Sequence, residues 1–187
     1  SSAVIVPAAS AKDMLEALAI RTELTSENFE PEDAVNVLST IARRFGDADD
    51  ETLVSWLRRL KPVYRYVSEL LPPLDTQGRL DDATWGAEQG RLQEIEILHQ
   101  QGEDSYGFSP AAEVFFVRSP DVLDRIPAED LPLFILQEEE ASRFGAHLGL
   151  RDLEAEAEAE PKLGDESTPT TKQVGEKLQH VAPYLLC

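Results

Sequence analysis

Cysteine, histidine and long apolar runs are scarce in this chain of 187 residues. Its only cysteine, Cys187, is the last residue, so no disulfide can form within the chain, and this cysteine usage is typical of a reducing compartment. No segment approaches the roughly 20 apolar residues that span a bilayer, and the first residues lack the basic and apolar regions of a secretory signal. We therefore expect a cytoplasmic protein that does not enter a membrane.

Motifs for catalysis, nucleotides and metals are also missing. No two glycines are separated by a single residue, which excludes the GxGxxG fingerprint, and the Walker A and GxSxG patterns do not occur. His99, His147 and His180 lie far apart in the sequence, so we interpret them as surface or packing residues and not as zinc ligands. The acidic run 46–51 lacks the glycine and glutamate of a calcium loop, and we interpret it as a helix cap. The sequence predicts no catalytic residue, no metal and no cofactor, and we expect that this chain alone is not an enzyme.

Acidic charge, in contrast, is in excess. The 36 acidic and 17 basic residues give a formal net charge of −19, which disfavours nucleic acid and favours a protein partner with a basic surface. Ten acids and three bases fall between positions 137 and 166. Such a strip can bind a basic surface or mimic a phosphate backbone, whereas solubility and protection of a strand edge are the simpler explanation. The candidate partner-binding acids of this strip are Glu154, Glu156, Glu158 and Glu160.

The first part of the chain has the patterns of amphipathic helices. Residues 10–20 predict a short helix with Ser10 as its N-cap. A second helix is predicted from Pro31, which suits the first helical position, to Gly46, which stands where a C′ glycine ends a helix. A third, longer helix is indicated by apolar residues that recur every three or four positions, namely Leu53, Leu57, Leu60, Tyr64, Val67 and Leu71. A kink or break is expected just before Pro62, because a proline ring clashes with the carbonyl four residues earlier.

The two tryptophans have different surroundings in the sequence. Trp56 lies beside the apolar stripe of the third helix, and we interpret it as a core residue. Trp85 falls in residues 73–90, whose glycines and acids predict an exposed connection with at most a short helix. A large aromatic side chain there either folds back onto the domain or anchors a partner, so Trp85 is a candidate partner-binding residue. Residues 91–99 fit neither the helix nor the strand period, and both structures remain open.

Two apolar segments in the second half predict a small sheet. Residues 114–117 and 133–136 have the β-branched and aromatic composition of buried strands, and residues 120–126 between them suit one helical turn. Residues 138–148 predict a helix that ends at Gly149.

The end of the chain is harder to assign. Residues 153–160 alternate between small or apolar residues and glutamate, a pattern typical of an edge strand, although alanine and glutamate favour helices. We favour the strand, because Pro161 follows. Residues 164–171 have the composition of a linker, and Thr170 with Gln173 forms a capping-box pair that predicts a C-terminal helix.

Three segments resemble those of sacsin-like proteins. Residues 106–120, running on into 130–136, resemble a strand entry of the form x-G-x-x-P-x-S/A-E-V-F that is followed by a D-x-L-x-x-x-x-P turn and a second apolar strand. Residues 14–29 are similar to the family's helix entry L-x-x-L-G-V-x-x-x-P-T-x-E-D-F, with alanine and leucine in place of its glycine and proline. Residues 133–150 resemble the ending LP-F-x-L-x-x-x-x-A…LGL.

The resemblance implies a role in recognition or relay. Sacsin-like proteins are large and multidomain, pair an Hsp90-like ATPase module with long repeat regions, and are associated with chaperone-like work. This chain shows no combination of ATPase motifs, so it would correspond to a region outside the ATPase module. The resemblance thus implies a non-catalytic segment that holds a partner or transmits the nucleotide state of an ATPase elsewhere.

The predictions combine into a mostly helical α+β fold. Residues 1–72 form an N-terminal helical half, and residues 73–105 form a connection. Residues 106–163 form a small sheet flanked by helices, and residues 164–187 form a linker with a C-terminal helix. The sequence leaves open whether these form one domain. The leading hypothesis for the function is an interaction or relay module of a sacsin-like, chaperone-type protein. The alternative is a stand-alone acidic protein that mimics nucleic acid and inhibits a basic partner, and an enzyme with an unrecognised carboxylate site is the third hypothesis.

Overall fold

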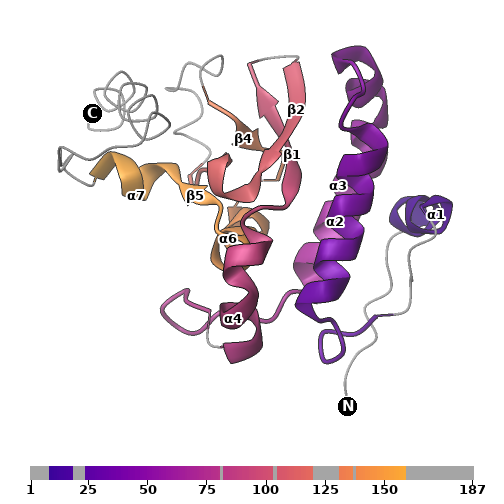
Figure 1. Ribbon diagram of the computed structural model, residues 1–187. Coiled ribbons are helices and arrows are strands. Elements are labelled where there is room, and N and C mark those ends of the chain that lie inside the picture. Colours follow the sequence, from indigo (N-terminus) through magenta and orange to yellow (C-terminus); the bar gives the residue numbers. More distant parts are fainter. Residues whose placement is uncertain are drawn as a thin grey trace.

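The structure, a computed structural model, describes residues 9–18, 24–80, 82–102, 105–119, 131–136 and 138–158. Its helices are α1 (Ala9–Ala17), α2 (Pro31–Phe45), α3 (Asp50–Leu70), α4 (Ala83–Leu92), α6 (Glu138–Leu148) and α7 (Leu153–Glu158), with a 3-10 turn, η1, at Ala111–Glu113. Its strands are β1 (Glu96–Gln101), β2 (Ser105–Pro110), β3 (Phe115–Phe116), β4 (Leu133–Phe134) and β5 (Arg151–Asp152). In Figure 1 the sheet lies beside the α2–α3 pair, with α4 and α6 below it. The predicted α+β class with a helical majority is confirmed.

The five strands form one mixed sheet in the order β2-β1-β4-β3-β5. β1 and β2 form an antiparallel hairpin, and β4 pairs antiparallel with β1 and parallel with β3. The predicted pairing of the strands at residues 114–117 and 133–136 is confirmed, because Phe115 lies opposite Leu133. Residues 91–99, for which the sequence left helix and strand open, contain both. The helix α4 ends at Leu92, and the strand β1 begins four residues later.

α2 begins where the sequence predicts. Pro31 is its first residue, and the side chain of Asp33 accepts a hydrogen bond from the Glu30 N–H at 3.1 Å, as part of a capping box. Gly46 differs from the prediction, because it is the C-cap itself, with a right-handed φ of −61°. Its N–H still donates to the Ala42 carbonyl at 2.6 Å, so the helical geometry continues into the cap.

α3 is one unbroken helix. Asp49 caps it by accepting from the Thr52 N–H at 2.8 Å, and hydrogen bonds with the side chain and the backbone of Thr52 lower the Asp49 pKa. The predicted break before Pro62 is wrong, because the helix runs through it. Interior proline costs a helix about 3 kcal/mol. Leu60 and Val63 on either side of it are 0% exposed, and burial of two such side chains contributes about 3 to 6 kcal/mol, which outweighs the penalty.

Two smaller expectations about the helical half also change. α1 begins at Ala9, so Ser10 lies inside its first turn and is not the N-cap. Trp56 is half-buried and not fully in the core. The centroid of its ring lies 5.3 Å from the centroid of the Phe45 ring. The Arg59 guanidinium lies over the Trp56 ring, 4.9 Å from its centroid.

Tyr64 joins the helices to the sheet. It is 0% exposed, and its ring packs against Phe134 of β4 and Phe144 of α6, with centroid distances of 5.8 and 6.0 Å. The Leu98 N–H of β1 donates a hydrogen bond to its hydroxyl oxygen at 3.0 Å. Burial raises the Tyr64 pKa, so the hydroxyl stays neutral. One side chain of α3 therefore contacts two strands and a helix.

α6 lies close to the sheet because one of its residues has no side chain. A Cβ added at Gly145 would stand 2.5 Å from the Phe116 ring of β3, well inside van der Waals contact. The helix ends as predicted at Gly149, whose φ of 77° is in the left-handed region that favours glycine.

The segment after β5 is helical, so the preference for an edge strand at residues 153–160 is wrong. α7 covers Leu153–Glu158, and Asp152 caps it by accepting from the Ala155 N–H at 3.1 Å. Leu153 is 0% exposed, which fixes the helix to the core. The helix propensity of alanine and glutamate thus prevails over the alternation. The predicted turn at 120–126, the linker 164–171 and the C-terminal helix lie outside the described residues.

Replacing Tyr64 by phenylalanine tests the junction. Tyr64→Phe keeps the ring contacts but leaves the buried Leu98 N–H without its acceptor, so we expect a loss of about 1 to 3 kcal/mol in the free energy of unfolding. Urea unfolding followed by circular dichroism measures it. A stability equal to that of the parent protein would show that the hydrogen bond contributes nothing.

Two glycines give a matched pair of substitutions. Gly145→Ala should destabilise the protein by about 1 to 3 kcal/mol, because the new methyl group collides with the Phe116 ring. Gly86→Ala, in the exposed part of α4 where a Cβ meets nothing within 4 Å, should stabilise it by about 0.5 to 1 kcal/mol. Thermal unfolding of both variants checks the opposite signs, and two shifts in one direction would contradict the packing of α6.

Candidate binding groove

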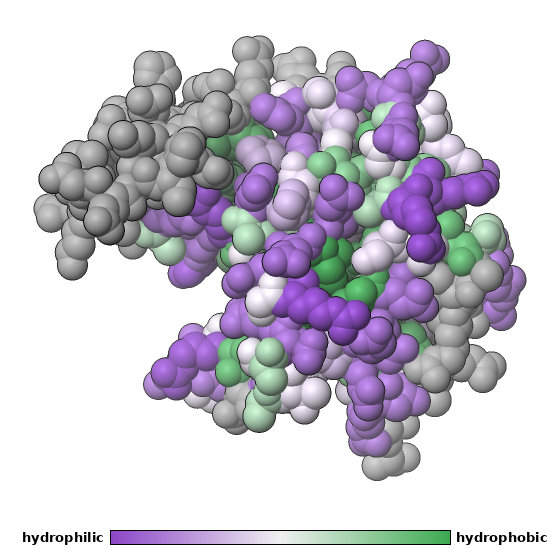
Figure 2. Space-filling model, in the orientation of Figure 1, coloured by the Kyte–Doolittle hydropathy of each residue, from purple (hydrophilic) through white to green (hydrophobic). Residues whose placement is uncertain are grey.

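An open groove of about 410 Å³ lies where α2, the end of α4 and the β1–β2 hairpin meet. Its apolar lining comes from all three parts and consists of Val35, Ala42, Ile95 and Pro110. Its charged lining consists of Arg43, Arg91, Glu94 and Glu96, and Ser39 completes it. Figure 2 shows hydrophobic surface in the middle of this face, bordered by hydrophilic residues.

An ion pair holds α4 against α2 at one end of the groove. The Arg91 guanidinium donates to both carboxylate oxygens of Glu32, at 2.9 and 3.3 Å. Glu88, one turn earlier on α4, lies 3.8 Å from the same guanidinium. The hydrogen bonds to Glu32 raise the Arg91 pKa further above its ordinary value. Arg91 is thus compensated by two carboxylates of the chain itself.

Backbone hydrogen bonds place the other wall of the groove. The Ala111 N–H donates to the Ile95 carbonyl at 2.8 Å, and the Ala112 N–H donates to the Gln93 carbonyl at 3.1 Å. They fasten the turn after α4 to the residues that follow β2, so Pro110 is held facing α2. The groove is a feature of the backbone arrangement and not of mobile side chains alone.

Trp85 is buried and is not among the residues that line the groove. It lies in α4, not in a loop, and is 2% exposed. Its ring stacks on Phe29 at 5.9 Å and contacts the edge of His147 at 5.1 Å. The interpretation of Trp85 as an exposed partner anchor is therefore wrong, and the alternative, that it folds back onto the domain, is confirmed.

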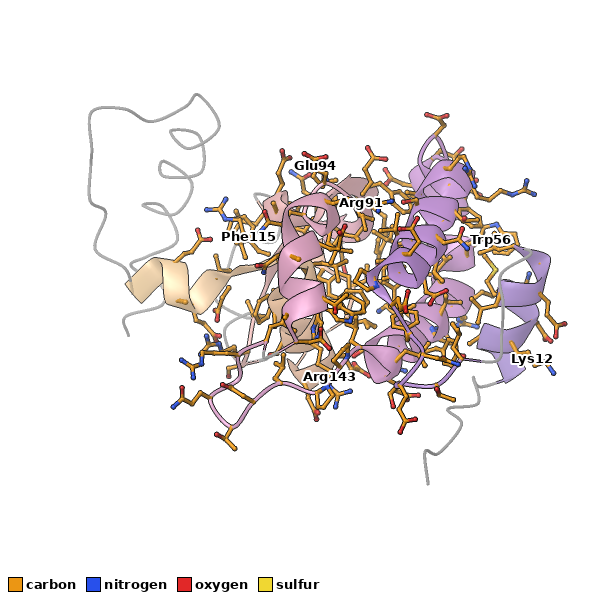
Figure 3. The ribbon with its side chains drawn as sticks, turned by 60° about the horizontal axis from the view of Figure 1, so that its bottom comes forward. Lys12, Trp56, Arg91, Glu94, Phe115 and Arg143 are labelled. Atoms are coloured by element: carbon orange, nitrogen blue, oxygen red, sulfur yellow. The ribbon has the colours of Figure 1, made fainter. Side chains whose placement is uncertain are left out.

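Three charges of the groove remain without an ion-pair partner among the described residues. They are those of Arg43, Glu94 and Glu96, all exposed. Arg43 has only a long hydrogen bond to the Thr40 hydroxyl, at 3.4 Å. Figure 3 shows Arg91 and Glu94 close together at the end of α4, away from Arg143. Among the described residues, the groove thus combines apolar lining residues with two unpaired carboxylates and one unpaired arginine, a combination that no motif in the sequence predicts.

The acidic strip proposed for partner binding is partly used inside the chain. The Glu154 carboxylate accepts the backbone N–H groups of Arg118 and Ser119 at 2.8 and 3.1 Å. Glu156 forms an ion pair with Arg151, which donates from Nε at 2.6 Å. Glu154 thus joins α7 to the residues after β3, and Glu156 joins it to β5, so the interpretation of these two carboxylates as free partner-facing groups is wrong. The side chain of Glu158 and the whole of Glu160 lie outside the described part of the chain.

His99 and Ser109 form a second polar pair, on the β1–β2 hairpin. The His99 Nε2 lies 3.0 Å from the Ser109 hydroxyl, a distance that also joins a base to a nucleophile in hydrolases. The His99 Nδ1, however, is buried and has no hydrogen-bond partner, so nothing orients the imidazole as the third member of a triad does. Burial also lowers the His99 pKa to about 4, which makes it a weak base at neutral pH. The pair is best explained as a hairpin contact.

The histidines that the structure describes are packing residues, as predicted. His99 is 6% exposed and His147 is 0% exposed, whereas His180 lies outside the described residues. The His147 Nδ1–H donates to the Arg143 carbonyl at 2.8 Å within α6. Among the described residues, no group of three or more histidine, cysteine or acidic side chains is arranged to hold a metal ion. None of the described helices is both long and apolar enough to cross a membrane.

Comparison with protein-family models, with curated proteins and with solved structures gave no match. The resemblance to sacsin-like proteins therefore stays a prediction.

Protonation of His99 should make the protein less stable in acid. Its folded-state pKa of about 4 lies below the value of about 6.5 for an unfolded chain, so the unfolded state takes up the proton first. Stability should fall as the pH drops from about 6.5 to 4, by at most about 1.4 kcal/mol per pH unit. Burial also lowers the pKa of His147, which adds to the trend.

The His99→Gln variant isolates the contribution of His99. It keeps a polar side chain near Ser109 but cannot be protonated, and His147 is present in both proteins. Urea unfolding of the parent and the variant near pH 7 and near pH 5 should show a smaller acid loss for the variant. Equal losses would contradict the prediction.

Proposed function

We propose that this chain is a non-catalytic protein-interaction module whose groove binds a segment of a partner protein. The observation that carries the proposal is the apolar lining by Val35 and Ile95 beside Glu94 and Glu96, whose carboxylates have no ion-pair partner among the described residues. The apolar lining accepts an apolar side chain, and the carboxylates attract a basic residue next to it. The partner is therefore an exposed chain segment with both kinds of residue.

The shape of the groove supports a segment and not an enclosed small molecule. Pockets for small molecules bury most of the ligand surface, whereas this groove is open along one face of the protein (Figure 2). A volume of about 410 Å³ accommodates a few side chains. Affinity would come from one apolar anchor in the groove, and the surrounding charges would select the partner.

The net charge gives the module its electrostatic character. At −19, the protein attracts basic partners from a distance and repels nucleic acid. That the module belongs to a sacsin-like, chaperone-type protein is part of this proposal, and its support is the order of the sequence segments. The second candidate, a stand-alone acidic protein that mimics nucleic acid, is favoured only by the charge and requires no groove.

A titration with a peptide separates the two candidates. The probe is a short unstructured peptide with one leucine between lysines, added to isotope-labelled protein. We expect amide chemical-shift changes to concentrate at groove residues such as Val35 and Ile95. The double variant Glu94→Lys, Glu96→Lys should bind at least about fivefold more weakly.

The matched control is the double variant Glu27→Lys, Glu69→Lys. It makes the same change of net charge at exposed sites outside the groove lining. Equal weakening by both double variants, or shift changes spread over all acidic surfaces, would favour the acidic mimic and contradict the groove. Hydrolysis of ATP by the purified chain would contradict the non-catalytic assignment.

A further inference from the structure

The exposed side of α3 is basic, in a chain that is otherwise strongly acidic. Between Glu51 and Glu69 the helix contains no acidic residue and four basic ones, Arg58, Arg59, Lys61 and Arg65. Acids outnumber bases by 36 to 17 in the whole chain, so such a stretch is unusual in its composition. It also lies on the longest described helix, which offers a rigid surface.

These residues form a stripe along the helix. Val54, Arg58, Lys61 and Arg65 are spaced by four, three and four positions, which places them on one side of an α-helix over about 16 Å. Val54 is 44% exposed, and among the described residues it is the one large hydrophobic side chain that is exposed. The opposite side of α3 carries Leu60, Tyr64 and other buried residues. The stripe therefore presents one apolar residue followed by positive charge.

The charges of the stripe are largely uncompensated. Arg58 and Lys61 make no ion pair with any residue that the structure describes. Arg65 lies 3.3 Å from Glu140 of α6, at an exposed position. Elsewhere, five arginines pair with carboxylates of the chain, namely Arg79, Arg91, Arg118, Arg143 and Arg151, whereas Arg43 and Arg44 of α2 form no ion pair with a described residue. Among the acids that the structure describes, none forms an ion pair with Arg58 or Lys61, so these two charges are not compensated within that part of the chain.

Arg59 adds an ordered donor beside the stripe. Its guanidinium lies 4.9 Å above the Trp56 ring, which itself packs on Phe45. Stacking holds the guanidinium in place while its N–H groups remain free for a carboxylate. An arginine fixed in this way loses less side-chain entropy on binding.

We infer that the α3 stripe is a second docking surface and that it binds an acidic segment of a partner protein that carries an apolar residue. Charge complementarity selects carboxylates, and Val54 provides the apolar contact. Phosphate would satisfy the arginines too, but a nucleic acid backbone has no apolar side chain to pack on Val54, which is 44% exposed beside them. None of the stripe residues lines the groove, so the two surfaces are separate.

The test uses the full chain and a defined probe. The probe is a short fluorescein-labelled peptide that carries glutamates and one leucine on the same helical side, and binding is followed by fluorescence anisotropy. Arg58→Glu should weaken binding by about tenfold, and Arg58→Lys should keep most of it. Val54→Ser should weaken binding with no change in net charge. Because Arg58 and Val54 are exposed, thermal unfolding should be almost unchanged in these variants.

Arg79→Glu is the matched control, because it makes the same charge change at an exposed site outside α3. The inference stands if the parent and this control bind the peptide alike and Arg58→Glu does not. It is overturned if the parent does not bind the peptide, or if Arg58→Glu and Arg79→Glu weaken binding equally. Tighter binding of a single-stranded oligonucleotide of equal charge would overturn the assignment to an acidic protein segment. Glu94→Lys with Glu96→Lys should leave peptide binding at the stripe intact, which separates this result from the groove.

Discussion

The hydrogen bond between the Tyr64 hydroxyl and the Leu98 N–H joins the two halves of the fold. Without it, β1 would present a buried, unsatisfied amide to the side chain of α3, at a cost larger than that of most surface interactions. The rings of Phe134 and Phe144 close around the same tyrosine, so the sheet and α6 take their places relative to α3 from one side chain. α2 contacts α3 through the rings of Phe45 and Trp56, and the groove lies between α2, the end of α4 and the β1–β2 hairpin.

Both surfaces proposed for binding follow from how the chain uses its charges. Most described arginines are neutralised by nearby carboxylates, which joins elements that are distant in sequence, as Arg91 and Glu32 join α4 to α2. The exceptions are informative. Within the described part of the chain, Glu94 and Glu96 have no ion-pair partner beside the apolar lining of the groove, and Arg58 and Lys61 have none beside Val54. On the two proposals, the groove would take a basic segment and the side of α3 an acidic one, so the module would contact more than one partner.

The sequence predicted local features well where one rule applied. Pro31 marked the start of α2, and Gly149 marked the end of α6, because both residues fix the backbone directly. It failed where two rules competed or where packing decided. Pro62 did not break α3, since the burial of its neighbours outweighs a lost hydrogen bond. Residues 153–158 became a helix because Asp152 caps them and Leu153 is buried. For Trp85 the sequence left packing and partner binding both open, because Phe29 and His147, its contacts, are distant in sequence.

The sequence by itself determined the mostly helical α+β class, the strand pair at 114–117 and 133–136, and the acidic character, because composition and periodicity are local properties of the chain. Tertiary structure alone decided the candidate groove. Val35, Ile95 and Pro110 line it from three elements, and no motif relates residues that only folding brings together. It also decided which charges are free, because an ion pair depends on distances in space: Glu156 meets Arg151, whereas Arg58 meets no carboxylate among the described residues.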